Sequence, residues 1–152
     1  MTELPEPMRL DLTRAAPEAH EALLALERAI RQFALDPRLL ELVRIRSSQI
    51  NACARCLQNH TRAALARGET PGRIFQLPAW EDSPHFSARE RAALRWTEAV
   101  TRVRDGHVPA EVYRAAREQF TEAELVELTV VIGSINMWNR LNIAFRTHVD
   151  PE

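Results

Sequence analysis

The stretch "ELVRIRSSQINACARCLQNHT", Glu41 to Thr61, contains both cysteines of this 152-residue chain and one of its five histidines. On both sides of the cysteines, apolar residues recur with the period of a helix and do not alternate as in a strand. The pair Asn51-Ala52 separates the two periodic parts. The stretch therefore predicts two antiparallel helices that leave a turn, with the cysteines at the start of the second helix.

The rest of the chain has the same periodicity, so we predict an all-α fold in a single domain over residues 1–152. Only four glycines are present, and no Asn-Gly or Gly-Gly pair indicates a hairpin. Helices are expected at residues 17–33, 36–50, 53–68, 87–103, 108–120 and 121–146, with a short helical turn within 70–77 and a loop over 78–86.

Several expected helix ends carry residues that satisfy unpaired backbone groups. Asp36 is a suitable N-cap ahead of Pro37, and Gly68 is expected to end the helix that begins at the cysteines. The segments Ser87–Glu90 and Thr121–Glu124 have the spacing of capping boxes, in which a hydroxyl and a glutamate each bond a backbone N–H. These local signals place the starts of the expected helices at 87–103 and 121–146.

Composition excludes several classes of protein. Twenty basic residues balance twenty-one acidic ones, so no basic surface indicates a nucleic-acid partner. The polar, proline-containing start has no apolar region of a signal peptide, and no apolar run is long enough to span a membrane. We therefore expect a cytoplasmic protein, where a close cysteine pair is more often catalytic or metal-binding than structural.

The segment 121–146 has apolar residues on more than one side. One stripe consists of Leu125, Leu128, Ile132 and Ile135, and further apolar residues lie elsewhere on the circumference: Val130, Met137, Leu141 and Phe145. Such a helix is covered on several sides, either as the central helix of the monomer or by another subunit. Asn139 and Arg140 lie within it and are expected to find hydrogen-bond partners there.

The spacing of Cys53, Cys56 and His60 places all three side chains on one arc of a helix about 60° wide. A Cys-x-x-Cys pair at a helix start can close a disulfide, and the unpaired N–H groups there stabilise a thiolate. A histidine one turn further along can accept or deliver a proton. This arrangement favours redox chemistry of the thiols.

Glu41 lies on the preceding helix, ten residues before Asn51, while His60 lies nine residues after it. At about 1.5 Å rise per residue, both are about 14 Å from the turn and therefore level with one another. We predict a hydrogen bond in which the Glu41 carboxylate sets the tautomer of His60.

Two other interpretations of the cysteine pair remain open. Free cysteines often serve as small buried apolar residues. The set Glu41, Cys53, Cys56 and His60 could also hold zinc, which takes four ligands in a structural site, but no second cluster of cysteines or histidines supplies further ligands.

The pattern Glu-x11-Cys-x2-Cys-x3-His, together with "LPAWEDSPHFSARERAALRWTEAVT" and "INMWNRLNIAFR", resembles the AhpD-like alkylhydroperoxidase core of the carboxymuconolactone decarboxylase superfamily. The likeness covers about residues 36–146. It implies an all-helical AhpD-like fold, assembly into homotrimers or homohexamers, and a peroxidase that needs no bound cofactor. Its partners would be a peroxide substrate and an external dithiol reductant.

The resemblance also implies roles for the four site residues. Cys56 would attack the peroxide and Cys53 would resolve the resulting sulfenic acid, while Glu41 and His60 would relay protons. Arg55 stands where well-known peroxidase members have a further histidine, and an arginine cannot act as a base at neutral pH. The alternative function is an oligomeric thiol sensor, zinc-binding or stress-response module without efficient peroxidase turnover.

The remaining aromatic residues and histidines give weaker signals. Trp96 is expected in the core, whereas Trp80 and His85 either pack the loop down or line the entrance to the site. The remaining histidines have no clustered partners and are expected on the surface: His20, His107 and His148.

Overall fold

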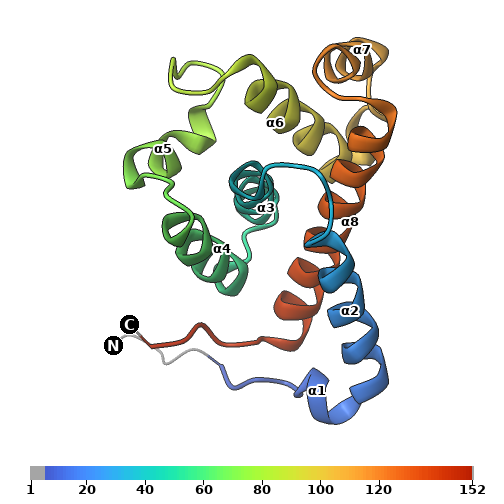
Figure 1. The fold of residues 1–152 in the computed structure, drawn as a ribbon. Coiled ribbons are helices and arrows are strands. Elements are labelled where there is room, and N and C mark those ends of the chain that lie inside the picture. The colour runs from blue at the N-terminus through green and yellow to red at the C-terminus, as the bar shows by residue number, and fades with distance from the viewer. Residues whose placement is uncertain (1–5, 152) are drawn as a thin grey trace.

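A computed structural model describes residues 6–151, so the first five residues of the polar N-terminal segment lie outside the described part. Within residues 6–151 all regular structure is helical, which confirms the predicted class (Figure 1). The α-helices are α1 (Leu12–Ala15), α2 (Pro17–Ile30), α3 (Pro37–Asn51), α4 (Ala54–Ala66), α5 (Pro71–Gln76), α6 (Ala88–Thr101), α7 (Ala110–Gln119) and α8 (Glu122–Phe145). Two short 3₁₀ helices, η1 (Leu77–Ala79) and η2 (Val103–Asp105), follow α5 and α6.

Helix α3 is the central helix of the fold, and α4, α6 and α8 pack around it (Figure 1). The alternative in which α8 is the central helix of the monomer is wrong, because α3 takes that place and Val126 and Ile143 of α8 are exposed. Leu42, Val43 and Ile45 of α3 are buried on different sides of that helix. The sequence does not indicate the central position of α3, because the helix contains polar residues that suggest a surface. These residues are buried together with partners from neighbouring helices.

The predicted caps are present. The Asp36 side chain accepts a hydrogen bond from the Arg38 N–H at 2.9 Å, and both capping boxes, at Ser87–Glu90 and Thr121–Glu124, are complete. Helix α4 ends at Ala66, two residues before Gly68, whose φ of 87° takes the chain out of the helix. Local chemistry thus fixes the helix ends as predicted.

Other boundaries differ from the prediction. Helix α2 ends at Ile30, not Phe33, and the short helix α1 was not predicted. A four-residue helix is too short for a periodic pattern, and its start depends on the Asp11 side chain, which accepts from the Thr13 N–H at 2.9 Å. Among residues 6–151, no helix is long and apolar enough to cross a membrane.

Two hydrophobic clusters lie on opposite sides of α3. The larger joins α3 to α2, α6, α7 and α8 and includes Trp96, as predicted. The smaller joins α3 to α4, α5 and α6 and includes Trp80, which is 1% exposed and packs the loop onto the domain. Trp80 donates its ring N–H to Glu98 at 2.8 Å, while His85 is exposed and bonds Gln76. Neither of these two residues lines the thiol site described below.

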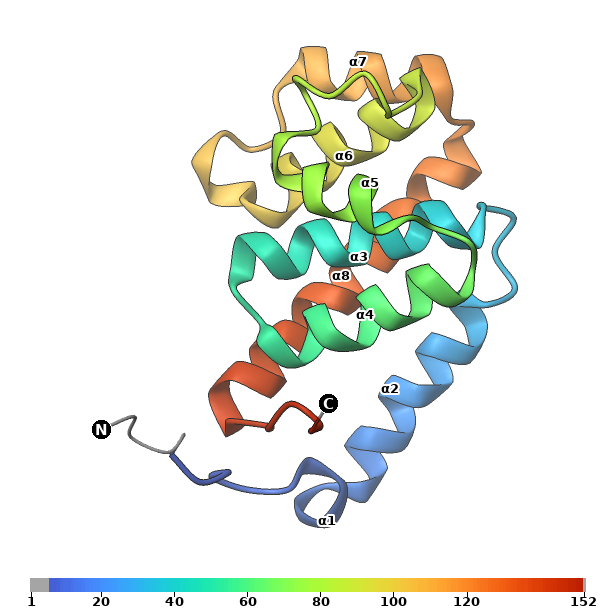
Figure 2. The same cartoon turned by 90° about the vertical axis from the view of Figure 1, so that its left-hand side faces the viewer.

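Helices α3 and α4 lie side by side and antiparallel, and α8 crosses behind them (Figure 2). The segments that precede α1 and follow α8 come together near the start of α4 (Figure 2). The backbone N–H of Arg9 donates to the carbonyl of Phe145, the last residue of α8, at 2.9 Å. His148 Nε2 lies 3.1 Å from the carbonyl oxygen of Glu6, so the two segments are joined directly. The start of α4 is therefore enclosed by α8, α2 and the two terminal segments.

Candidate functional site

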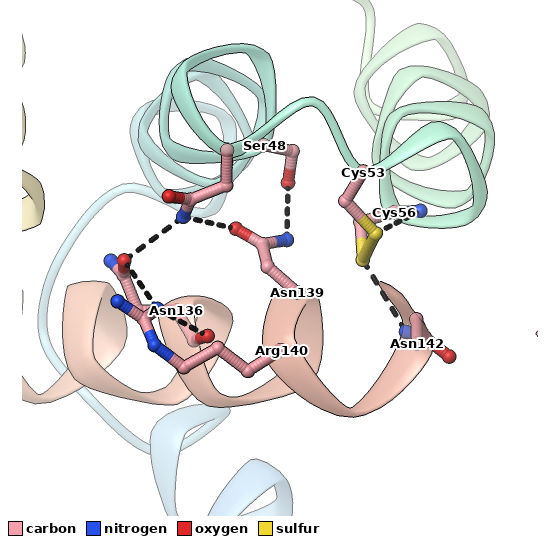
Figure 3. Close-up of a disulfide and its surroundings, with 8 residues drawn as sticks. Ser48, Cys53, Cys56, Asn136, Asn139, Arg140 and Asn142 are labelled. Carbon is pink, nitrogen blue, oxygen red and sulfur yellow. Dashed lines mark hydrogen bonds between the residues drawn. A yellow bond between two sulfur atoms is a disulfide. The ribbon is translucent and has the colours of Figure 1, made fainter. Parts of the chain in front are cut away.

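The reversal between α3 and α4 places the cysteine pair. Ala52 adopts the left-handed conformation, with φ of 57°, and ends α3. Cys53 is the N-cap of α4, and its sulfur accepts a hydrogen bond from the Cys56 backbone N–H at 3.4 Å. The two sulfurs are joined as a disulfide, and the cysteines are only 1% and 2% exposed (Figure 3). The predicted Cys-x-x-Cys motif at a helix start is confirmed.

Buried polar side chains hold this reversal against α8. The Asn51 amide donates to Asn139 at 2.8 Å and to Asn136 at 3.0 Å, and Asn139 donates to Ser48 at 3.0 Å (Figure 3). The predicted partner network of Asn139 is confirmed. Arg140 also finds its expected partner, since it donates to the Asn136 carbonyl at 2.8 Å, and its long side chain reaches solvent from the outer face of α8.

The predicted contact between Glu41 and His60 is present. His60 Nδ1 lies 2.8 Å from Glu41 Oε2, across the α3–α4 interface. Glu41 is 2% exposed, whereas His60 is half-buried. Because the carboxylate binds Nδ1, the hydrogen bond leaves Nε2 of the ring as the nitrogen available for proton transfer.

Glu41 is ionised despite its burial. Desolvation raises the pKa of its carboxyl group, but the hydrogen bond and charge of His60, with the charges of Arg44 and Arg67, together lower the pKa below its ordinary value. Arg44 Nη1 lies 3.1 Å from Glu41 Oε1. A paired, hydrogen-bonded buried carboxylate of this kind keeps a fixed orientation and holds its imidazole partner in place.

The sequence did not indicate that the ion pair of Glu41 and Arg44 continues to a residue of α2. Arg44 Nη2 lies 2.9 Å from Glu27 Oε2, and Glu27 also accepts from Ser134 and from the Trp138 ring N–H. A continuous row of charges thus runs from Glu27 through Arg44 and Glu41 to His60. Glu27 lies 17 residues before Arg44 and on a different helix, so no local spacing relates the two residues.

Cys56 and His60 line one cavity of about 380 Å³, and Cys53 does not line it. The wall is largely apolar, and its apolar residues come from α8, from α1 and from the segment before α1: Met8, Leu12, Ile135, Trp138, Leu141 and Phe145. His20 also lines this cavity and meets Trp138 edge-on, with ring centroids 6.2 Å apart, so its expected surface position is wrong. His107 and His148 are exposed, as predicted.

Arg55 lies at the rim of the cavity, and its charge is paired. Its guanidinium is 2.5 Å from Asp150, on the segment that follows α8. Gln58 holds the same segment through two hydrogen bonds of 2.8 Å with the Asp150 backbone. Arg55 therefore fastens this segment to α4 and supplies little free positive charge to the thiols.

We expect Asp150→Ala to loosen this segment and to speed alkylation of the reduced protein by a bulky maleimide, with little change for iodoacetamide. Exposed ion pairs contribute about 0.2–1 kcal/mol, so the acceleration should not exceed about fivefold. Stopped-flow alkylation would measure it, with the exposed Asp105→Ala as the charge-matched control. Equal acceleration in both variants would contradict the fastening role.

Within residues 6–151, the structure places no three His, Cys, Asp or Glu side chains together as a metal site. Of the four residues in the zinc interpretation, Glu41 and His60 are bonded to one another, and Cys53 and Cys56 are joined as a disulfide.

Comparisons with known proteins give a family match and several similar chains. The sequence profile of the carboxymuconolactone decarboxylase family matches residues 17–99, which include all four predicted site residues. The uncharacterized protein YdfG of Bacillus subtilis is 38% identical over 136 residues, which cover 90% of this chain and 92% of YdfG.

Two solved structures share the fold. A protein of unknown function from Agrobacterium tumefaciens, described as a candidate AhpD antioxidant-defence protein, is 34% identical, with a TM-score of 0.93 over 96% of this chain and all of that one. The debrominase Bmp8 is 19% identical, with a TM-score of 0.82 over 91% of this chain and 74% of its own, a likeness of fold alone.

Proposed function

Because this chain belongs to the carboxymuconolactone decarboxylase family, we propose that it is a thiol-dependent peroxidase that reduces organic hydroperoxides and is regenerated by an external dithiol. The arrangement of one cavity carries the proposal. Cys56 opens into it, Cys53 is bonded behind Cys56, and His60 lines it with ionised Glu41 at its back. The likeness to the candidate antioxidant protein of Agrobacterium tumefaciens supports the same class of chemistry.

In the oxidative half of the cycle, the Cys56 thiolate attacks the terminal oxygen of the hydroperoxide. The S–O bond forms as the O–O bond breaks, and the departing alkoxide takes a proton from His60 and leaves as an alcohol. Cys56 is now a sulfenic acid. Cys53 then attacks its sulfur and gives up its thiol proton, the S–S bond forms as the S–O bond breaks, and the departing hydroxide takes that proton and leaves as water. Two thiols are oxidised and one hydroperoxide is reduced.

In the reductive half, a thiolate of the dithiol enters the cavity and attacks Cys56, the sulfur that lines it. Cys53 leaves as a thiolate at the N-terminus of α4, where the Cys56 N–H stabilises its charge. The second thiol of the reductant then releases Cys56 and closes the reductant's own disulfide. This half requires a dithiol pool, and we place the protein in the cytoplasm for that reason.

Thiol titration of the reduced protein tests the proposal. One equivalent of an organic hydroperoxide should remove two thiols and yield one equivalent of alcohol, and a suitable dithiol from a panel should then sustain turnover. Disulfide formation without turnover by any dithiol would favour the redox-sensor alternative. Unchanged thiols would refute the peroxidase.

We also propose that the protein is a homotrimer or homohexamer. A single chain leaves an apolar groove between α6, α7 and α8, where Tyr113 is 48% and Val126 is 64% exposed. Burial of such a face stabilises association by about 25 cal/mol per Å² of apolar surface. Light scattering should therefore give three or six times the 17.4 kDa chain mass, and Val126→Lys should lower it. A monomer at micromolar concentration would contradict this assembly.

A further inference from the structure

We propose that Asn142 is a catalytic residue that donates a hydrogen bond to the Cys56 sulfur and stabilises it whenever that sulfur is a thiolate. The inference rests on the proposed function, which requires Cys56 to be a thiolate twice in each cycle. It adds a side chain from α8 to a set of reacting residues that otherwise come from α3 and from α4 with its N-cap.

The contact is direct. Asn142 Nδ2 lies 3.4 Å from the Cys56 sulfur, and the close-up shows the amide reaching from α8 toward the disulfide (Figure 3). Asn142 is half-buried and lines the same cavity as Cys56. The apolar wall around it reduces competition from water, so a hydrogen bond to a charged sulfur is stronger there than in solvent.

The two sulfurs have different donors. The Cys53 sulfur accepts from the backbone N–H of Cys56 at the helix start, whereas the Cys56 sulfur accepts from the Asn142 side chain. Arg55 near Cys56 is paired with Asp150, and His60, whose Nδ1 is bound to Glu41, is the group that transfers the proton. Of the hydrogen bonds to the two sulfurs, the one from Asn142 reaches Cys56 and the one from the backbone reaches Cys53.

A neutral amide suits this role. It presents N–H groups to a thiolate without titrating over the working pH range, so it cannot consume the proton that His60 must transfer. It would act first on the thiolate that attacks the peroxide, and again when the second thiol of the reductant displaces Cys56. Charge-assisted hydrogen bonds of this kind are stronger than neutral ones.

The test measures the pH dependence of iodoacetamide alkylation in the Cys53→Ser background, where Cys56 is the only thiol. Asn142→Leu should raise the alkylation midpoint by about one pH unit, which is about a tenfold loss of thiolate below the midpoint. Asn142→Asp should raise it further, because it replaces the donor by a negative charge of similar size. Ile143→Ala, which removes an exposed side chain of the same helix, should leave the midpoint unchanged.

A midpoint that stays within about 0.2 units in folded Asn142→Leu overturns the inference. If the leucine variant does not fold, the Asn142→Asp variant decides, and a midpoint that does not rise overturns it equally. The assay uses no peroxide, so the two proposals fail separately. A raised midpoint in a protein that never consumes peroxide refutes the peroxidase and retains the hydrogen bond to Cys56.

Discussion

Cys56→Ser protein is expected to consume no hydroperoxide, a complete loss and the largest effect of any single substitution in this chain. Cys56 is the sulfur that lines the cavity, while Cys53 is 1% exposed and lies behind it. A serine hydroxyl is not ionised at neutral pH and is a far weaker nucleophile than a thiolate. Peroxide consumption followed by a coupled colour assay would measure the loss.

Cys53→Ser is the matched control, because it removes the other sulfur of the same disulfide. We expect a single burst of one equivalent of peroxide, after which Cys56 remains a sulfenic acid that a dimedone-type probe labels. The reverse pattern, with Cys53→Ser inactive and Cys56→Ser giving the burst, would exchange the two roles. Full turnover in both variants would exclude the pair as the site.

Glu41→Ala is expected to give the largest loss of stability, about 3–5 kcal/mol in the free energy of unfolding at pH 7, because it breaks a buried ion pair from one side. The substitution leaves Arg44, itself 9% exposed, with Glu27 as its remaining carboxylate, and removes the partner of His60. The burst of peroxide consumption should also slow, because the imidazole loses its fixed orientation. Urea unfolding and stopped-flow kinetics would measure the two effects.

The pH dependence identifies the charge of Glu41 as the cause. Its pKa is lowered in the folded protein from an ordinary value of 4.5, so its stabilising contribution is complete above that value and disappears as pH falls through the lowered pKa. The difference between wild type and Glu41→Gln should therefore be largest near neutral pH and shrink below about pH 4.5. Exposed Glu111→Gln is the control. A difference that does not change with pH would assign the loss to packing.

Features set by local geometry could be predicted from the sequence. The capping boxes at Ser87–Glu90 and Thr121–Glu124 depend on residues three apart, and the Glu41–His60 hydrogen bond follows from equal distances to one turn. Asp36 is likewise a cap whose partner lies two residues away. In the caps the local backbone fixes the relative positions, and in the Glu41–His60 pair the antiparallel reversal at Ala52 fixes them.

Features that join distant helices could not be predicted in this way. Arg44 looks like a surface residue of an amphipathic helix, yet it is buried because Glu27 on α2 supplies a second carboxylate. Asn142 and His20 come to the cavity from α8 and α2, and nothing in their local sequence relates them to Cys56. The central position of α3 was hidden for the same reason, since its polar residues are satisfied only in the folded chain.

The segments before α2 and at the end of α8 line the cavity but do not belong to the hydrophobic core. Substitutions in these segments should therefore cost less stability than substitutions in the core. Met8 and Thr13 before α2, and Phe145 and Thr147 at the end of α8 and beyond, line the cavity without entering the clusters around α3. Substitutions there reshape the chamber in front of Cys56 and leave the α3–α4 reversal untouched. On the proposed function, directed evolution toward new hydroperoxides should therefore start from these flanking positions, because they are separate from the reactive thiols.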